Sequence, residues 1–361
     1  MTLSQPAVQL VILPAADAEV WDRFVEQHPE GRFSQLWGFQ QVLQQTYGYR
    51  CVYRKILSGG ELVGVFPSVA VGPGKRRLIS QPFQEYGGPL TLPLSSAQSA
   101  ELAEALFHLS EDQGCGSIEI RGGIGCDPLA ESPYCKRHHL YSFAVLPLCE
   151  KEKLWRHSLT NEARKAVKRG QAAGLHVEIL RGENAVAPPF YEMYLISMKR
   201  LGVPPHPRCF FTNLASALGP RVVSATVIHE TGRIAYLLGV VTGKRIQVYI
   251  TASKPEAWSL RPNDLAHWEL INWAFAAGIE LFDFGSARYP GQIHFKQKWG
   301  VTFYDYNYYL VGPPNSSVIS QVHSVSSSSK LMTAAADLWR HIIPLRLSSV
   351  LGPPIRKVLT K

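Results

Sequence analysis

The stretch FDFGSARYPGQIHFKQKWG, residues 282–300, combines side chains that chemistry uses with ones that pack. Asp283 lies in a short apolar strand, a loop with Arg288 follows, and two lysines, Lys296 and Lys298, come just before a tryptophan. A carboxylate can accept a proton, and an ammonium is a compact charge that can lie beside an anion. Packing alone does not require this mixture, so the stretch is the first candidate site.

Each of these side chains also has a structural explanation, and the sequence leaves the choice open. Lys296 could be solvated on a short helix, and Asp283 could accept hydrogen bonds from nearby backbone N–H groups. Lys298 comes two residues after Lys296, and such positions do not share one face of a helix, so it is the second choice. Trp299 is predicted to be a packing anchor that fixes the lysines.

Size and charge limit the classes of protein to consider. The 361 residues are 46% hydrophobic and 18% charged, which is enough for two globular domains. A net charge of +9 favours a polyanionic partner such as a phosphate-bearing cofactor, a nucleotide-linked sugar, tRNA or anionic lipid. The six cysteines have neither disulfide nor metal-type spacing, so no metal site is predicted. The first apolar run is too short for a signal peptide, and we expect a cytoplasmic protein.

Apolar segments of strand type alternate with helical segments, which indicates an α/β or α+β fold. The clearest strand-type segments are 8–13, 61–71, 222–229, 234–242 and 246–253. A polar helix begins soon after residue 148, and a serine-rich segment begins after residue 313. We therefore expect an N-terminal domain at 1–148, a C-terminal domain at 149–313, and a linker with a basic amphipathic tail at 314–361.

The two halves of the chain repeat one pattern. Residues 102–123 predict a helix, a glycine turn, a strand and a glycine, and residues 265–287 predict the same order. A shared unit near the end of each half suggests a tandem duplication of one domain.

Two further segments carry groups suited to anions. A polar helix crowds Arg164 and three other basic side chains into less than two turns, which is either a solvated face or one that faces an anion. The loop SKPEAWSLRPND leads into a helix that we expect to begin with Asn263 as N-cap and to stop at Gly278. Unpaired N–H groups at such a helix start can bind phosphate, and Arg261 lies beside them.

Common nucleotide-binding and hydrolase motifs are absent from the sequence. It contains neither GxxxxGKS nor GxGxxG, and neither GxSxG nor HExxH. P-loop ATPases, dinucleotide-binding domains, α/β-hydrolases and zinc proteases of the HExxH type are therefore not supported.

Several motifs follow one another in a fixed order, and together they carry a resemblance. They are RFSQLWGFQQVLQQTYGYR (32–50), LVGVFP (62–67), LISQPFQEYGG (78–88), NEARKAVKRGQAAGLHVEI (161–179), FDFGSA and FKQKWG. This order resembles the FemAB/FemX-like branch of the GNAT acyltransferase superfamily, in particular bacterial members with a BioF2-like acetyltransferase domain, some of them associated with exopolysaccharide systems. The resemblance covers roughly residues 15–312. It implies two tandem GNAT-like domains with mixed central sheets flanked by helices, and acyl transfer to an amine of an envelope-type acceptor.

The sequence departs from the GNAT pattern at two points. The Q/R-x-x-G-x-G/A pyrophosphate loop is missing, which is usual for the FemAB-like branch. The donor therefore stays open among acyl-CoA, acyl carrier protein and aminoacyl-tRNA, with no tightly bound cofactor expected. Related members often read DFGRS where this chain reads DFGSA, and the nearest arginine is Arg288.

The resemblance implies roles for particular residues. Lys296 matches the lysine of the FK motif and would act as a charge near the developing oxyanion or a donor phosphate. From their own chemistry, Asp283 could accept a proton from the attacking amine, and Tyr249 could protonate the leaving group, although a half-buried strand tyrosine is an ordinary alternative. Arg261 and Asn263 are the residues expected to contact the donor.

Further residues are expected to bind the acceptor. In QPFQEYGG the glycines suit a loop whose backbone approaches a ligand, and a plain turn is the alternative. The resemblance implies that this loop lies in a cleft between the two domains. Trp37 could line that cleft or pack in the core, and His206 lies in a proline-rich loop that could cover it. The predicted substrate-binding residues are Trp37, Gln84, Glu85, Tyr86, Arg164, Arg288 and Lys298.

The tail has its own composition. After the serine-rich linker it is apolar with several basic residues and one acid, Asp337. Such a segment could lie on an anionic membrane surface, which would suit a lipid-linked acceptor and a place at the inner face of the membrane. Docking back on the protein is the alternative.

The leading hypothesis is an N-acyltransferase whose partners are a donor carrier and an amine-bearing envelope precursor. One alternative is an aminoacyl-tRNA-dependent transferase of the peptidoglycan bridge type. Another is a non-catalytic member of the fold that binds a ligand or tRNA. Nucleic acid is a partner only if tRNA is involved.

Overall fold

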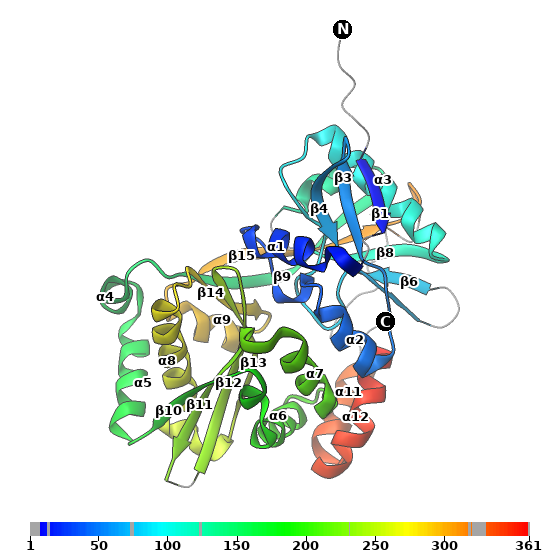
Figure 1. Cartoon of the computed structure of the whole chain (residues 1–361). Coiled ribbons are helices and arrows are strands. Elements are labelled where there is room, and N and C mark those ends of the chain that lie inside the picture. Colours follow the sequence, from blue (N-terminus) through cyan, green and yellow to red (C-terminus); the bar gives the residue numbers. More distant parts are fainter. Residues whose placement is uncertain are drawn as a thin grey trace. The chain divides into compact units, whose positions relative to one another are not determined.

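The computed structural model describes residues 8–12, 15–72, 76–122, 125–230, 232–316, 319 and 330–359. The chain forms two compact units (Figure 1). Unit 1 comprises Met1–Tyr141 and Asp305–Val325 with the last two residues, and unit 2 comprises Ser142–Tyr304 and Ser326–Leu359. These limits differ from the expected 1–148, 149–313 and 314–361, because β9 (Cys135–Pro147) and β15 (Thr302–Val311) each begin in one unit and end in the other. Most of the predicted serine-rich linker, residues 317–318 and 320–329, lies outside the described residues.

Unit 1 contains two sheets. The first is antiparallel and has the order β1 (Val8–Ile12), β3 (Arg54–Ser58), β4 (Glu61–Phe66) and β7 (Leu90–Thr91). The second has the order β15, β8 (Cys115–Arg121), β6 (Arg76–Ile79), β5 (Val69–Val71) and β2 (Arg50–Cys51), in which β6 and β8 are parallel. Its helices are α1 (Ala18–Gln27), α2 (Phe39–Tyr47) and α3 (Ser96–Asp112), with short 3-10 turns at Ala15–Asp17, Phe33–Gln35 and Asp127–Glu131.

The helix α3 packs one face on the second sheet of unit 1. Ser95 caps its start, since the Ser95 hydroxyl accepts the backbone N–H of Gln98 at 3.2 Å. Leu102 and Leu106 are buried in one cluster with Ile118 of β8. Apolar residues at this helical spacing pack one stripe of the helix on the sheet and leave the other side polar.

Unit 2 contains one mixed sheet and most of the helices. Its strand order is β10 (His176–Arg181), β11 (Val222–His229), β12 (Gly232–Thr242), β13 (Arg245–Ser253), β14 (Leu281–Ala287) and the end of β9. The helices are α4 (Lys151–Lys153), α5 (Asn161–Ala172), α6 (Pro188–Leu201), α7 (Arg208–Leu218), α8 (Pro262–Ala276), α9 (Pro290–Gln297), α11 (Lys330–His341) and α12 (Leu345–Leu359). Single turns lie at Leu154–Ser158, Gly182–Val186, Gly219–Arg221 and Pro255–Leu260.

Helices cover both faces of this sheet (Figure 1). Leu237 of β12 is buried in the cluster that contains Leu265 and Ile271 of α8. Tyr236, the next residue along the strand, points to the other face and lies edge-on to Phe190 of α6, with ring centroids 5.7 Å apart. Alternate residues of one strand therefore serve two helical layers.

The repeated order predicted from the sequence is present in both units. In unit 1, β6 is followed by the short strand β7 of the other sheet, and then by α3, a left-handed glycine at Gly114 and the parallel strand β8. In unit 2, β13 is followed by α8, a left-handed glycine at Gly278 and the parallel strand β14. Together with the mixed sheets flanked by helices, this confirms the predicted fold class.

The tail docks on unit 2 through α11 and α12. The Lys199 ammonium of α6 donates to the carbonyl of Arg340 at 2.9 Å, and the Arg340 guanidinium donates to the carbonyl of Leu201 at 3.2 Å. The described part of the tail therefore packs back on the protein. Over the described ranges, none of the helices has the length and apolarity needed to cross a membrane.

Candidate active site

The strands β13 and β14 form only a short ladder and then separate. They pair over Arg245–Gln247 and Leu281–Asp283, although β13 continues to Ser253 and β14 to Ala287. We call residues 247–253 and 283–287 the strand split. Backbone groups that leave a ladder need new hydrogen-bond partners, so this is a natural place for a ligand or for a specialised side chain.

Both strands carry an extra residue at the split. On β13, Leu238 of β12 pairs with Ile250 and Gly239 pairs with Val248, so Tyr249 is the bulged residue. On β14, Val145 of β9 pairs with Asp283 and Ala144 pairs with Gly285, so Phe284 is the bulged residue. Bulges bend a strand and redirect its side chains, and they are frequent beside active sites.

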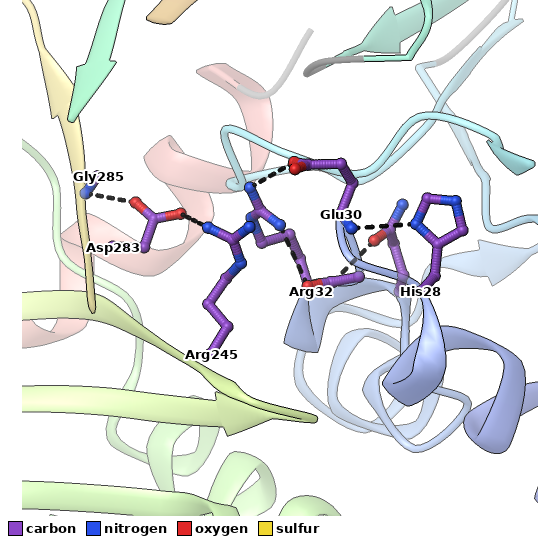
Figure 2. A network of polar contacts seen from close by, with 8 residues as sticks. His28, Glu30, Arg32, Arg245, Asp283 and Gly285 are labelled. Carbon is purple, nitrogen blue, oxygen red and sulfur yellow. Dashed lines mark hydrogen bonds and ion pairs between the residues drawn. The ribbon is translucent and has the colours of Figure 1, made fainter. Parts of the chain in front are cut away.

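Asp283 supports the bulge in β14. It is fully buried, and its Oδ1 accepts the N–H of Gly285 at 2.8 Å. Gly285 has φ +72°, a left-handed conformation that a side chain disfavours. On the other side, Nη1 of Arg245 lies 3.6 Å from Oδ2 of Asp283 (Figure 2). These contacts match the structural alternative for Asp283, and its role as proton acceptor stays a prediction.

Lys296 lies at the split and contacts the backbone of β14. The side chain is buried, and its ammonium donates to the carbonyl of Phe284 at 2.7 Å, to that of Gly285 at 2.8 Å, and to that of Ser286. An ammonium has three N–H donors, and here three carbonyls use them. The lysine therefore holds the bulged part of β14, and a contact with a substrate oxyanion would require it to share or exchange one of these partners.

Lys298 forms a buried ion pair with Asp264 in the first turn of α8. Next to this pair, burial, with a smaller contribution from the two lysines, lowers the pKa of His267 to about 3. His267 stacks on Phe284 with ring centroids 5.3 Å apart. Trp299 is fully buried in the same group, 6.0 Å from Phe284, as expected of a packing anchor.

Tyr249 and His206 lie close together. The Tyr249 hydroxyl is 3.5 Å from Nε2 of His206, and Tyr249 is only half-buried. Burial holds the pKa of His206 well below its usual value, and Arg356 adds to this effect, so the imidazole is neutral. The loop around His206 is fixed to α6, since its N–H donates to the Tyr194 hydroxyl at 2.9 Å.

The start of α8 differs from the expectation. The sequence predicted Asn263 as N-cap, but the helix begins at Pro262 and its N-cap is Arg261 in a left-handed conformation. Proline suits the first helical position because its fixed φ is helical and its missing N–H costs nothing there. Asn263 instead donates its side-chain amide to the Ser253 hydroxyl at 3.2 Å. Arg261 is exposed, and its contact with a donor stays a prediction.

Two other predicted arginines lie in different settings. Nη1 of Arg164 donates to the carbonyl of Leu159 and, at 3.1 Å, to that of Trp155, so this side chain holds the end of the preceding turn. Arg288 is exposed, and its backbone N–H is bonded to the Gln292 side chain at 3.0 Å. Arg288 is therefore the one whose side chain is more accessible to solvent.

The predicted residues of unit 1 are mostly packed. Trp37 lies against Trp21 and Tyr53, with centroids 5.6 and 5.7 Å apart. Gln84 and Tyr86 are 3% exposed, and Glu85 is half-buried. Trp37 thus matches the packing alternative, and its binding role stays a prediction.

The loop 81–88 uses its glycines on the protein itself. The N–H groups of Gly87 and Gly88 both donate to the carbonyl of Arg121 at 3.0 Å. A Cβ on Gly87 would lie 2.4 Å from Cβ of Gln81, so the chain approaches itself closely there.

Residues 28–32, which are far from this loop in the sequence, form a polar network beside it (Figure 2). The Arg32 guanidinium lies 4.7 Å over the Tyr86 ring and pairs with Glu30 at 3.0 Å. His28 accepts the N–H of Glu30 at 3.0 Å through its Nδ1. Tyr86 is therefore held by a charged neighbour that the sequence alone did not connect with it.

Sequence analysis missed Arg245, Asp264 and His267. Asp264 forms an ion pair with Lys298, Nη1 of Arg245 lies 3.6 Å from Oδ2 of Asp283, and His267 is hydrogen-bonded to the carbonyl of Asn263 at 2.7 Å. The partners of the first two pairs are 34 or more positions apart along the chain. For Asp264 the sequence offered one local signal: an acidic residue is favoured in the first turn of a helix.

Comparisons with known proteins agree with this geometry. Residues 156–297 match the family model described as the acetyltransferase (GNAT) domain, and this segment includes both strands of the split. None of the curated proteins matches the chain in sequence.

Three solved structures illustrate the fold. FemX superposes with a TM-score of 0.67 at 14% identity, covering 83% of this chain and 96% of that one. The C-terminal domain of an Agrobacterium fabrum protein described as a lysylphosphatidylglycerol synthetase has a TM-score of 0.56 at 13% identity, covering 90% and 96%. A tandem GNAT protein from the clavulanic acid biosynthesis pathway has a TM-score of 0.55 at 13% identity, covering 85% and 99%.

The resemblance to FemX-like tandem GNAT proteins is therefore confirmed at the level of the fold. Residues 156–297 match the acetyltransferase (GNAT) domain model, which supports transferase activity in general terms.

Proposed function

We propose that the protein is an N-acyltransferase that moves an acyl or aminoacyl group from an activated carrier to an amine of a cell-envelope polysaccharide or peptidoglycan-type precursor. The strand split is the observation that supports this most. β13 leaves β14 after Gln247, and an acyl carbonyl laid along the edge of β13 would meet backbone N–H donors fixed in place by the rest of the sheet.

The transfer forms a bond between the acceptor nitrogen and the acyl carbon and breaks the bond from that carbon to the carrier's sulfur or oxygen. Negative charge develops on the carbonyl oxygen, and the donors proposed to stabilise it are those N–H groups of residues 248–253 that point away from β12. Alignment of the amine with the carbonyl supplies much of the remaining rate.

Protons must also move. The attacking nitrogen loses one proton, and the leaving sulfur or oxygen gains one. Tyr249 is the group proposed to donate to the leaving atom, because its hydroxyl belongs to the split and faces the neutral Nε2 of His206 at 3.5 Å. It then recovers a proton from the product side, which leaves the protein unchanged.

Lys296 has a positioning role in this proposal. Its three carbonyl contacts keep β14 bulged away from β13, so the N–H edge of β13 stays available to the substrate. Asp283 and Gly285 support the same bulge from the other side.

The donor is proposed by analogy of fold. The tandem GNAT structure is described as one without acetyl-CoA, which makes an acyl-CoA a donor to test, and the Agrobacterium fabrum protein is described as a lysylphosphatidylglycerol synthetase. Acyl-CoA, acyl carrier protein and aminoacyl-tRNA are therefore the donors to test, and an envelope acceptor agrees with the second of these names.

A tRNA-dependent transferase, or a tRNA-binding protein without activity, is the second candidate. It is favoured by α5, on which Lys165, Lys168 and Arg169 are all exposed. Exposed basic side chains on one helix suit the phosphate backbone of a nucleic acid.

The function is tested by adding acetyl-CoA, acetyl-acyl carrier protein and alanyl-tRNA separately to the purified protein. A bound donor raises the unfolding temperature, and mass spectrometry with an amino-sugar or peptide acceptor detects the amide. We expect one donor to give both effects, and Tyr249→Phe to keep the thermal shift while losing most of the product. Failure of all three donors to stabilise the protein or to give an amide would contradict the enzyme hypothesis, and stabilisation by tRNA without product would favour the second candidate.

A further inference from the structure

The inner face of α12 is fixed on unit 2. Ser348 and Gly352 are buried, and a Cβ on Gly352 would lie 2.3 Å from Cδ of Pro205. The Arg356 guanidinium donates to the carbonyl of Pro204 at 2.7 Å. The close contact at Gly352 and the bond from Arg356 set the rotation of the helix, so the opposite face is determined as well.

That opposite face is an exposed apolar stripe. It consists of Leu347, Val350, Leu351, Ile355 and Val358, whose side chains are between 40% and 67% exposed. Their positions follow the spacing i, i+3, i+4, i+8 and i+11, which places them along one side of a helix. Leu338 and Ile342 of α11 are also exposed, at 51% and 66%.

This concentration of apolar side chains stands out from the rest of the surface. Fourteen large apolar residues are exposed in the parts of the chain that the structure describes, and eight of them lie between 338 and 359. Single exposed apolar residues need no explanation, but a continuous group marks an interaction surface. Unit 2 cannot be that partner, because it already contacts the inner face of α12.

Charge indicates what the partner is. Arg346 and Lys357 are exposed, and eleven residues at 100° each place them about 20° apart on the helix, along one edge of the stripe. α12 contains no aspartate or glutamate, and the one acid of α11, Asp337, pairs with Arg340 at 2.7 Å. An apolar stripe with a basic edge suits an anionic bilayer surface, whereas two copies of this face would bring basic side chains together.

We propose that α12 is a peripheral membrane contact that lies along the surface of an anionic bilayer. The stripe enters the boundary between headgroups and acyl chains, and Arg346 and Lys357 contact lipid phosphates. This contact is independent of the acyl-transfer chemistry, so either proposal can fail without the other.

The test is co-sedimentation of the full chain with vesicles of phosphatidylcholine alone or with 30% phosphatidylglycerol, at low and high salt. We expect binding to the anionic vesicles, weaker in high salt, and little binding to the neutral ones. Val350→Ser with Val358→Ser removes apolar contact and is expected to lower the partition coefficient by about tenfold. Arg346→Gln with Lys357→Gln is expected to lower it by about tenfold or more, since each basic residue contributes separately.

Val20→Ser is the matched control, because Val20 is 46% exposed on α1 of unit 1; it should bind as the unchanged protein does. Equal binding to neutral and anionic vesicles would overturn the proposal, and so would unchanged binding by both double variants. A dimer in sedimentation without vesicles that the Val350→Ser, Val358→Ser variant abolishes would assign the stripe to a second copy of the chain instead. All the altered side chains are exposed, so unfolding temperatures should stay within about 1 °C of the original.

Discussion

The parallel strand pairs of the two units begin alike and end differently. In unit 1, Ile79 of β6 pairs with Glu119 of β8, and in unit 2, Gln247 of β13 pairs with Asp283 of β14. An arginine lies two residues before Ile79 and another lies two residues before Gln247. Arg77 pairs with Glu119 at 3.0 Å, and Arg245 lies 3.6 Å from Asp283. Both pairs thus hold an arginine beside an acid at this point, although the register of β6 on β8 shifts between Arg76 and Leu78 and that of β13 on β14 does not shift.

Beyond these positions, the two parallel strands stay bonded in unit 1 and separate in unit 2. In unit 1, Ser80 donates its N–H to the carbonyl of Glu119 at 2.8 Å and accepts the N–H of Arg121 on its hydroxyl, also at 2.8 Å. Gly87 and Gly88 then bond to the carbonyl of Arg121. At the position of Arg121, unit 2 has Gly285, whose carbonyl is bonded instead by Lys296.

The difference shows how one supersecondary unit serves two purposes. In unit 1, a loop supplies the hydrogen bonds of the second strand, and the strand pair is a scaffold. In unit 2, a glycine and a lysine hold the second strand in a bulge, and the backbone N–H groups along the edge of the first strand stay available to a substrate. The predictions below test this contrast, beginning with the largest effect.

Replacing Lys296 with Met should have the largest effect on the difference between the two strand pairs. Three buried carbonyls lose their donor, which should cost about 3 kcal/mol or more of the free energy of unfolding, and transfer should fall at least about a hundredfold because β14 is no longer held. Urea denaturation and the transfer assay measure the two effects. Lys153→Met, at an exposed position, is the control and should change neither, and a Lys296 variant as stable as the original would mean that its contacts do not hold the split.

The two buried acids should differ in what they support. Glu119→Gln leaves Arg77 and Arg121 without a carboxylate and should cost about 3 kcal/mol, with no direct effect on chemistry. Asp283→Asn keeps an oxygen for the N–H of Gly285, so it should cost about 1 kcal/mol and lower transfer by less than about tenfold if the residue only supports the bulge. A loss of a hundredfold or more, with the fold intact, would instead make Asp283 the proton acceptor.

Acid should weaken unit 2 through its buried neutral histidines. Burial lowers the pKa of His267 to about 3 and holds that of His206 well below its usual value. Between those values and 6.5 the unfolded chain binds the extra protons, so stability is full above pH 6.5 and is lost as the pH falls. Each histidine should cost about 1.5 kcal/mol between pH 6.5 and 5. Urea denaturation at several pH values gives the slope of the free energy of unfolding against pH. We expect a smaller slope in His267→Gln than in the original protein, and the original slope in His108→Gln, whose imidazole is exposed. Equal slopes in the original protein and both variants would refute the role of the buried histidines.

Gly285→Ala should have an effect on stability as small as that of Asp283→Asn. A side chain at φ +72° costs about 1 kcal/mol and favours a regular strand over the bulge. The matched control is Gly116→Ala in β8, where an added Cβ meets nothing within 4 Å. Urea denaturation compares the two, and a Gly285 variant as stable as the Gly116 variant would show that the bulge does not need glycine.

The sequence predicted the repeated helix, glycine and strand because these depend on local spacing and turn chemistry. It also gave catalytic roles to Asp283, Lys296 and Tyr249, whose positions the structure brings to one strand split, while the roles stay predictions. It could not show that Lys296 faces three carbonyls, or that Asp283 meets Arg245, since such contacts depend on register between strands far apart in the chain. The N-cap was misplaced by two residues because Arg261 adopts a left-handed conformation that its side-chain type does not favour.

Hydrogen exchange with and without donor tests the central claim most directly. Acetyl-CoA, acetyl-acyl carrier protein and alanyl-tRNA are added in turn, and deuterium uptake is followed in β13 and β14 of unit 2 and in β6 and β8 of unit 1. The account predicts that the donor which stabilises the protein slows exchange at residues 248–253, with no change at 79–81 and 119–121. Protection confined to β6 and β8 would contradict it, and so would stabilisation by a donor that leaves residues 248–253 unprotected.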